Sequence, residues 1–457
     1  MMERKLENMQ CFVDGLVDKY KVPAMSMAVW CNDKVYKAAN GILNIETGIQ
    51  ATTDSIFQIG SIGKVFTASL IMQLVDEGKI NLDTPVKNYL RDFQIACSEA
   101  TQSITVRQLL CHTSGMAGDF FPDDGVESGN YIARYLDRCY LLPQVHPVGE
   151  MFSYSNSAYC IAGRLIEVVS GISWAKAVEE RIVKPLNMSH VATTQETSRF
   201  RTAIGHSADP KNKNRWLPES QRYFPLGLAP AGTVLAMTAS DLITFGLAHL
   251  RGGRTDVGES WLSKQTVMEM QTSQVELPPH SPCFVTSWGL GWFKSNYANV
   301  SLFGHGGQTL GQTSLLMIVP EQNLIFSILL NGTRWIGMTL IESLIADTLK
   351  ELVGVENSEE ELSNHIDNPE RFCGQYDSLG QGWEVTLDKG VLMATAIVKS
   401  QKKPPEKLIL KSIDDNSFAT YSYSGGERHL NIVFQKPDDT GCPKYLFYGL
   451  NLSVRVA

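Results

Sequence analysis

The chain alternates between stretches whose hydrophobic residues follow a helical period and stretches that read as strands. Apolar side chains recur every three or four positions between residues 4 and 20, which predicts a leading helix. Residues 25–30 and 34–39 are apolar runs separated by Asn32 and Asp33, a spacing typical of two paired strands joined by a tight turn. The N-terminal part therefore predicts a helix followed by a β-hairpin.

The middle of the chain is helical, and strand patterns return late. An almost wholly apolar run after Ser61 predicts a buried helix that ends near Gly78. Short apolar runs bounded by turns predict later strands at residues 286–294, 300–303, 314–319 and 324–330, followed by a helix at 336–352. We expect the early and late strands to share one sheet, with residues from about 85 to 220 inserted as a helical lobe. A cleft between sheet and lobe would suit a small-molecule site.

The composition changes after residue 353. Residues 354–369 are polar and acidic, which predicts a linker. Seven short strands with alternating patterns follow, at residues 371–376, 383–387, 391–398, 407–410, 417–423, 429–434 and 444–453. They predict a small all-β barrel. We therefore divide the chain into a domain at 1–353, a linker at 354–369 and a barrel domain at 370–457.

Charge and cysteine content narrow the class of protein. The 457 residues carry a net charge of −8, which argues against a nucleic-acid-binding surface. No apolar stretch reaches the roughly 18 residues of a membrane helix, and no secretory signal opens the chain. Nine scattered cysteines without a C-x-x-C pair fit reduced thiols in a cytoplasmic protein better than a disulfide scaffold or a metal site. The oligomeric state stays open.

The sequence around Ser61 combines a nucleophile with a candidate base. Lys64 follows by about one helical turn, so its amine can reach the serine hydroxyl. A neutral amine can take the proton of that hydroxyl, and burial among apolar residues would lower the lysine pKa enough to allow it. The helix N-terminus would also offer backbone N–H groups to an oxyanion. Taken alone, however, this spacing also fits an ordinary helix start with a solvated lysine.

A second stretch with matching chemistry lies just before a predicted helix at residues 158–170. The hydroxyl of Tyr154 could relay a proton between a nucleophile and a leaving group. Asn156, two residues later, could donate an amide N–H to a substrate carbonyl. Judged alone, the same residues fit a capping loop with a packed tyrosine.

A third stretch is rich in glycine and lies between two predicted strands. It holds His305, followed by Gly306, Gly307 and Gln308. Glycines would let a substrate backbone approach closely, and the Gln308 N–H could complete an oxyanion hole with the Ser61 N–H. A histidine at a strand end is by itself more typical of a structural role.

Together the three motifs resemble the serine β-lactamase-related superfamily, which comprises class C β-lactamases, DD-peptidases and related esterases and aminopeptidases. The motifs are S-x-x-K at Ser61 and Lys64, Y-x-N at Tyr154 and Asn156, and H-x-G at His305, Gly306 and Gly307. Residues 109–116 and 230–242 are similar to two further segments of that family, LLxHTSG and PAGG…ST..DL. The resemblance covers roughly residues 10–350.

The resemblance implies an α/β (α+β) fold with a β-lactamase/transpeptidase-like antiparallel sheet, and the barrel resembles the lipocalin-like domains of some members. It implies that Ser61 is the nucleophile and that Lys64 and Tyr154 handle protons, without a metal or cofactor. The residues implied to bind substrate or oxyanion are Asn156, His305, Gly307 and Gln308.

Two departures from the family pattern bear on the substrate. His305 stands where true β-lactamases and DD-peptidases carry lysine, which weakens the case for penicillin-like carboxylates and favours the esterase and D-aminopeptidase branches. Val148 replaces the proline that precedes Gly149 in the family, a minor loop change. The missing secretion signal argues against a cell-wall role.

The sequence therefore predicts a cytoplasmic serine hydrolase that acts through an acyl-enzyme on an ester or amide bond of a small molecule or short peptide. An acyltransferase or peptide cyclase would use the same acyl-enzyme, and the sequence does not separate it from a hydrolase. A catalytically silent binding protein is the third alternative, although the motif residues are all kept. We interpret His112 as structural and the thiols of Cys111 and Cys160 as non-nucleophilic. An α/β-hydrolase is disfavoured because no G-x-S-x-G elbow occurs.

Overall fold

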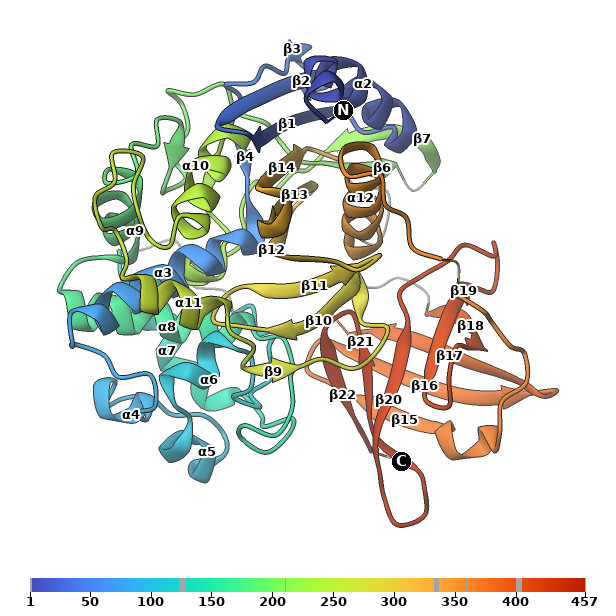
Figure 1. Cartoon of the computed structure of the whole chain (residues 1–457). Coiled ribbons are helices and arrows are strands. Elements are labelled where there is room, and N and C mark those ends of the chain that lie inside the picture. Colours follow the sequence, from blue (N-terminus) through green and yellow to red (C-terminus); the bar gives the residue numbers. More distant parts are fainter. Residues whose placement is uncertain are drawn as a thin grey trace.

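Figure 1 shows the computed structural model of the chain, which describes residues 2–122, 129–209, 211–332, 337–358, 360–399 and 405–456. A central sheet lies between two layers of helices, and a closed barrel adjoins this body. The mixed α/β class with an antiparallel sheet and a C-terminal all-β barrel is thus confirmed.

The central sheet has nine strands in the order β3-β2-β1-β14-β13-β12-β11-β10-β9, and neighbouring strands are antiparallel. The strands are β1 (Ala24–Cys31), β2 (Lys34–Asn44), β3 (Ile49–Gln50), β9 (Val275–Glu276), β10 (Val285–Trp288), β11 (Phe293–Tyr297), β12 (Val300–Thr309), β13 (Gln312–Val319) and β14 (Leu324–Leu330). Strand β1 pairs with β2 on one side and with β14 on the other. Early and late strands therefore share one sheet, as expected.

Helices cover both faces of this sheet, and the burial of β1 shows it. All eight residues of β1 are buried, with Ala28 and Trp30 in one hydrophobic core and Met27 and Val29 in the other. One face packs against α3 (Gly63–Asp76), α8 (Asn156–Ser170) and α10 (Ala239–Leu250), the other against α1 (Met2–Glu7), α2 (Met9–Tyr20) and α12 (Gly337–Leu352). A strand buried on both faces reads as a continuous apolar run, which is how the sequence shows it.

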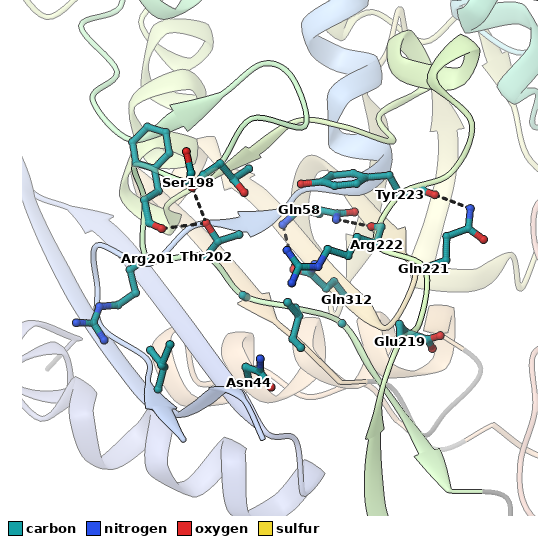
Figure 2. Close-up of a pocket in the computed structure, with 16 residues that line it drawn as sticks. Asn44, Gln58, Ser198, Arg201, Thr202, Glu219, Gln221, Arg222, Tyr223 and Gln312 are labelled. Carbon is teal, nitrogen blue, oxygen red and sulfur yellow. Dashed lines mark hydrogen bonds between the residues drawn. The ribbon is translucent and has the colours of Figure 1, made fainter. Parts of the chain in front are cut away.

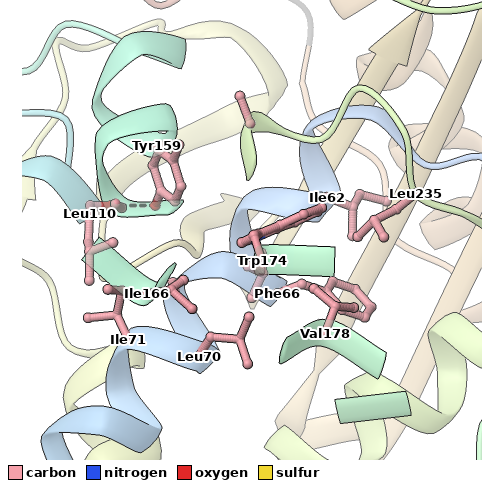
Figure 3. Packing of buried hydrophobic residues seen from close by; sticks show 14 of the residues in the cluster. Ile62, Phe66, Leu70, Ile71, Leu110, Tyr159, Ile166, Trp174, Val178 and Leu235 are labelled. Carbon is pink, nitrogen blue, oxygen red and sulfur yellow. Dashed lines mark hydrogen bonds between the residues drawn. The ribbon is translucent and has the colours of Figure 1, made fainter. Parts of the chain in front are cut away.

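Helix α3 runs through the middle of the first core. The first twelve of its residues, Gly63 to Leu74, are buried. Figure 3 shows Phe66, Leu70 and Ile71 packed among side chains of the surrounding helices. A helix that is apolar all round must lie inside the protein, so the residues at its N-terminus are held by packing on every side. It ends at Asp76, close to the predicted Gly78.

Helices dominate the predicted lobe. They are α4 (Val86–Tyr89), α5 (Ser98–Ser103), α6 (Val106–Leu110), α7 (Tyr131–Asp137), α8 and α9 (Trp174–Val178), and α11 (Lys264–Gln271) lies later in the chain. The sequence prediction missed a hairpin formed by β6 (His206–Asp209) and β7 (Asn212–Pro218). This hairpin is largely polar and only partly buried, so it lacks the apolar alternation that marks a half-buried strand.

Two late strand predictions need correction. Residues 286–294, predicted as one strand, form β10 and β11 with a turn at Gly289 to Gly291. Gly291 has a φ of 90°, which favours glycine and breaks the run. The glycine-rich stretch at His305 lies inside β12 and pairs with β13, not between two strands. The glycines are typical of a turn, but here their backbone pairs with β13 and the strand continues through them.

The C-terminal strands form a closed barrel of β15 (Gly374–Asp377), β16 (Gln381–Asp388), β17 (Val391–Val398), β18 (Glu406–Ser412), β19 (Ser417–Ser422), β20 (Ile432–Pro437), β21 (Pro443–Tyr448) and β22 (Asn451–Arg455). Residues 444–453, predicted as one strand, are therefore two, joined by a turn at Gly449 and Leu450 with positive φ angles. Within the predicted linker, Ser363 pairs with Ser412 of the barrel. The domain boundaries themselves stay a prediction.

The barrel packs directly on the rest of the protein. Side chains of Phe447, Leu450 and Leu452 belong to the same core as Met151 and Phe152. The Tyr154 N–H donates to the Leu450 carbonyl at 2.9 Å, and the Leu452 N–H donates to the Ser153 hydroxyl at 3.3 Å. The barrel thus reaches the loop that carries Tyr154.

The described ranges contain neither a membrane-spanning helix nor a ready-made metal site. Within them, no helix combines the length and apolar character needed to cross a bilayer. No group of three or more His, Cys, Asp or Glu side chains in those ranges is arranged to hold a metal ion. All nine cysteines are free thiols.

Candidate active site

Ser61 lies in a single 3-10 turn, Gly60–Ile62, that leads into α3. The preceding strand β4 (Phe57–Gln58) pairs with β8 (Ala236–Met237), which pairs in turn with β5 (Val191–Ala192). Gly60 has a φ of 51°, and a Cβ there would lie 2.3 Å from the Gln308 nitrogen and so collide with β12. Only glycine fits this close approach, which brings the backbone of Gln308 beside Ser61.

The Lys64 side chain is fully buried and reaches three oxygen atoms. Its Nζ lies 3.1 Å from Ser61 Oγ, 2.7 Å from Asn156 Oδ1 and 2.7 Å from the Ala231 carbonyl oxygen. The amide and carbonyl oxygens can only accept hydrogen bonds. A neutral amine therefore uses its two N–H groups on them and turns its lone pair toward the Ser61 hydroxyl.

Burial sets the protonation of Lys64. Desolvation lowers the pKa of the amine to about 7, opposed by the Cys160 thiol and the Asp119 carboxylate. A large fraction of Lys64 is thus neutral near pH 7 and able to accept a proton. The apolar residues around the lysine in the sequence predicted this lowered pKa, and the burial of Lys64 in the structure is its cause.

Tyr154 approaches the same pair from the other side. Burial raises the pKa of its phenol, although a hydrogen bond with the Ser61 side chain partly opposes this. The Lys64 Nζ lies 4.9 Å from the centre of the Tyr154 ring. The phenol is therefore neutral near pH 7 and can donate or relay a proton rather than serve as a standing phenolate.

His112 supports the loop that carries Tyr154. Its Nδ1 accepts a hydrogen bond from the Ser155 N–H at 2.9 Å, and its ring stacks on that of Tyr154 with centroids 4.3 Å apart. Burial lowers the pKa of His112, so the ring is neutral. Burial likewise raises the pKa of the neighbouring Cys111 thiol and keeps it protonated.

Strand β12 supplies the remaining predicted residues. His305 is buried, and its Nδ1 donates to the Gly306 carbonyl at 2.5 Å, which leaves the Nε2 lone pair without a donor among the described residues. Burial, helped by Lys64, lowers the pKa of His305 to about 3. A Cβ on Gly307 would lie 1.9 Å from the Ile59 carbonyl oxygen, while Gln308 is exposed. The six other predicted site residues therefore all lie around Ser61.

A cavity of about 200 Å³ opens beside Ser61. Residues that the sequence predictions missed also line it, including Asp119, Cys283, Val285, Trp288, Phe293, Met338, Ile341, Gly449, Leu450 and Asn451. Most of these are apolar. They come from the loop at Asp119, the 3-10 turn Pro282–Phe284, β10, β11, α12 and the turn between β21 and β22, and no motif marks them. Only the tertiary structure brings them to Ser61.

A larger cavity of about 580 Å³, shown in Figure 2, is lined by another set of residues that includes Gln58 of β4. Gln58, whose N–H donates to Gln312 Oε1 and whose side chain donates to the Arg222 carbonyl, stands in its wall. Ser61, Lys64 and Tyr154 do not line it. The chemistry therefore belongs to the smaller cavity.

The fold and the cluster of Ser61, Lys64 and Tyr154 are those of a serine hydrolase. Comparison with known proteins shows to which family the chain belongs. The model of the Beta-lactamase family matches residues 9–346. Penicillin-binding protein 4 of Amycolatopsis lactamdurans is 35% identical over 351 residues, which span 76% of this chain and 90% of the relative. The chain belongs to the Beta-lactamase family, whose members are serine hydrolases.

Solved structures agree in fold. SurE superposes over the full length of both chains with a TM-score of 0.78 and 26% identity, so the similarity includes the barrel. A D-stereospecific amidohydrolase from Streptomyces sp. matches 76% of this chain and 99% of its own, with a TM-score of 0.60 and 25% identity.

Proposed function

We propose that this protein is a serine hydrolase that cleaves an amide or ester bond of a small molecule or short peptide through an acyl-enzyme at Ser61. The observation that carries the proposal is the position of Lys64. Its amine is buried and has a pKa of about 7, so a large fraction of it is uncharged at pH 7. Two acceptors occupy its N–H groups, which directs its lone pair at the Ser61 hydroxyl. Such an arrangement activates a serine nucleophile.

In the proposed acylation step, Ser61 Oγ attacks the substrate carbonyl and its proton passes to Lys64. The Ser61 N–H, which the first turn of a helix leaves without a helical partner, stabilises the oxyanion together with the Gln308 N–H of β12. Tyr154 protonates the leaving group, and the proton that Lys64 took from Ser61 then passes to the Tyr154 phenolate. Water then releases the acyl group by the same proton path in reverse.

The remaining residues would orient the substrate. His305 offers a neutral acceptor at Nε2, suited to a substrate N–H or O–H and unsuited to the carboxylate that a lysine would bind. The wall formed by Trp288, Phe293 and Ile341 favours an apolar group near the scissile bond. A D-configured residue is a reasonable first choice, since a relative of known fold is named a D-stereospecific amidohydrolase.

The test combines labelling with turnover. Wild type, Ser61→Ala and Ser69→Ala are treated with a fluorophosphonate probe and assayed on p-nitrophenyl esters and on D- and L-phenylalanine p-nitroanilides. Ser69 lies on the same helix and its hydroxyl bonds to the Val65 carbonyl and to His249, away from Ser61, so it controls for the substitution itself. We expect a single adduct at Ser61, and a loss of turnover of about 10³-fold or more in Ser61→Ala only. Neither adduct nor turnover in wild type would contradict the proposal.

Hydrolysis and acyl transfer are separated by adding a primary amine to the assay. If the protein is a hydrolase, the free acid stays the main product as the amine concentration rises. Accumulation of the amide at the expense of the acid would instead assign an acyltransferase.

A further inference from the structure

The cavity beside Ser61 holds a carboxylate that the mechanism above does not use. Asp119 lines this cavity together with Ser61, Tyr154 and Asn156. Its side chain lies deep among protein atoms, yet part of its surface remains accessible from the cavity. A charged group in such a position needs a partner.

The backbone fixes Asp119 over the loop that carries Tyr154. The Ser157 N–H and hydroxyl both donate to the Gly118 carbonyl, at 3.2 and 3.1 Å. A Cβ on Gly118 would lie 2.1 Å from the Tyr154 carbonyl oxygen, so the two segments touch with no room for a side chain. The next residue, Asp119, is therefore held at a defined place in the site.

The hydrogen bonds of Asp119 occupy only part of its carboxylate. Asn156 Nδ2 donates to Oδ1 at 3.1 Å, and Asn156 Oδ1 in turn accepts from Lys64. In the part of the chain that the structure describes, no cationic side chain forms an ion pair with Asp119, and Lys64 acts on it only through space. A carboxylate can accept about four hydrogen bonds, and when Lys64 is neutral no side chain among the described residues balances the Asp119 charge.

The barrel encloses the space next to Asp119. A Cβ on Gly380, in the turn between β15 and β16, would lie 3.7 Å from the Asp119 Cβ. Leu450 and Asn451 of the turn between β21 and β22 line the same cavity. Apart from these polar groups the wall is largely apolar, so the few polar atoms decide how a substrate lies.

We propose that Asp119 binds a protonated amine carried by the substrate close to the scissile carbonyl. A structural carboxylate would be saturated by protein donors, whereas this one keeps an accessible face inside the catalytic cavity. A single carboxylate suits an ammonium group, and the described residues that line the cavity include no second acidic side chain. The inference rests on the proposed function and names its substrate class, amino-substituted amides or esters.

The amine could sit on either side of the scissile bond, and two substrate pairs distinguish these sources. For the acyl side, phenylalanine p-nitroanilide (both enantiomers) is compared with 3-phenylpropionyl p-nitroanilide, which lacks only the amino group. For the leaving side, the 2-aminoethyl ester of 3-phenylpropionic acid is compared with its propyl ester. The readout is the ratio of kcat/KM between the amino substrate and its partner.

The variant is Asp119→Asn and the matched control is Asp137→Asn, which removes an equal charge from an exposed position at the end of α7. Asp119→Asn changes all rates through Asn156 and Lys64, and the ratio cancels this shared effect. We expect wild type to favour one amino substrate at least tenfold, and Asp119→Asn to lower that ratio by roughly 10–100-fold, the range of a hydrogen bond to a charged group. Asp137→Asn should keep the wild-type ratio.

A second measurement uses wild type alone, in case the variant does not fold. The ion 2-phenylethylammonium should slow fluorophosphonate labelling of Ser61 at a concentration at least tenfold below that required of 2-phenylethanol. Equal protection by both, or ratios within twofold in both substrate pairs, would overturn the assignment of Asp119 while leaving the hydrolase intact. Failure of labelling and of all turnover would overturn the proposed function itself.

Discussion

The Lys64 nitrogen shows how a single buried atom can define a site. A lysine without an ion-pair partner is costly to bury in its charged form, and here that cost lowers its pKa to about 7. The Asn156 side-chain oxygen and the Ala231 carbonyl accept hydrogen bonds from its N–H groups, so the amine keeps its position when it is neutral. The same burial that destabilises the ammonium makes the base available at physiological pH.

The first prediction concerns the pH dependence of acylation. Because the neutral amine is the base, we expect kcat/KM for a p-nitrophenyl ester to be half-maximal near pH 7 and to fall about tenfold per pH unit below it. Activity is thus lost as the pH falls through the pKa of the folded protein. A stopped-flow profile between pH 5 and 9 measures this.

The Lys64→Arg variant is the control for this assignment. A guanidinium stays protonated throughout this range, so the variant should be inactive at every pH tested. A wild-type profile that is flat from pH 5 to 9 would contradict the role given to Lys64.

At the scale of elements, β12 and the turn at Gly60 form the site by contact between backbones. A Cβ at Gly307 would lie 1.9 Å from the Ile59 carbonyl oxygen, and the Ser314 hydroxyl of β13 donates to that same oxygen at 2.6 Å. The strand and the turn therefore fix the distance between the N–H groups of Ser61 and Gln308.

The second prediction follows from this contact. Gly307→Ala must push β12 away from the turn, so we expect kcat to fall by roughly 10²-fold, the effect of losing one oxyanion donor. Overpacking should also lower the free energy of unfolding by about 1–3 kcal/mol. Single-turnover kinetics and urea denaturation measure the two effects.

Gly306→Ala is the matched comparison. The added methyl group meets only the flexible end of Ile341, at 2.8 Å, so this variant should lose much less activity and stability. Equal losses in both variants would show that the backbone contact at Gly307 is not what limits the rate.

At the scale of the whole molecule, the barrel contributes residues to the wall of the active-site cavity. Its outward-facing Phe447 and Leu452 lie in the core that contains Phe152, and its turn at Leu450 lines the cavity. The Tyr154 N–H donates to the Leu450 carbonyl. Barrel and catalytic loop are therefore coupled through one continuous packed interface.

The third prediction tests this coupling. Phe447 is 1% exposed, and its ring centroid lies 6.4 Å from that of Phe152. We expect Phe447→Ala to reduce the free energy of unfolding by about 3–5 kcal/mol and to lower kcat/KM as well, because Tyr154 follows Phe152 by two residues. Urea denaturation and ester hydrolysis measure both.

Val391→Ala, at an exposed position of the same barrel, should change the free energy of unfolding by less than about 0.5 kcal/mol. If Phe447→Ala destabilised the protein but left the kinetics unchanged, the barrel would support folding without shaping the site.

The sequence by itself determined the elements and residues whose signal is local. Helix α3 is apolar all round, α6 begins at a Thr105 cap, and the motif residues stand at spacings that can be read along the chain. These features depend on neighbours within a few positions, so the order of side chains suffices to predict them. The division of 286–294 and of 444–453 into two strands each was missed, because a turn inside an apolar run has only a weak signal.

Only the tertiary structure decided which distant side chains meet. The neutral base, the wall of Trp288 and Phe293, the accessible carboxylate of Asp119 and the barrel turn at Leu450 come from segments far apart in the chain. Burial depends on what packs from all directions, and the pKa of a group depends on burial. The role of Ser61 could be predicted from its motif because the motif is local. The specificity of its cavity could not, because the cavity is formed by residues that only the fold brings together.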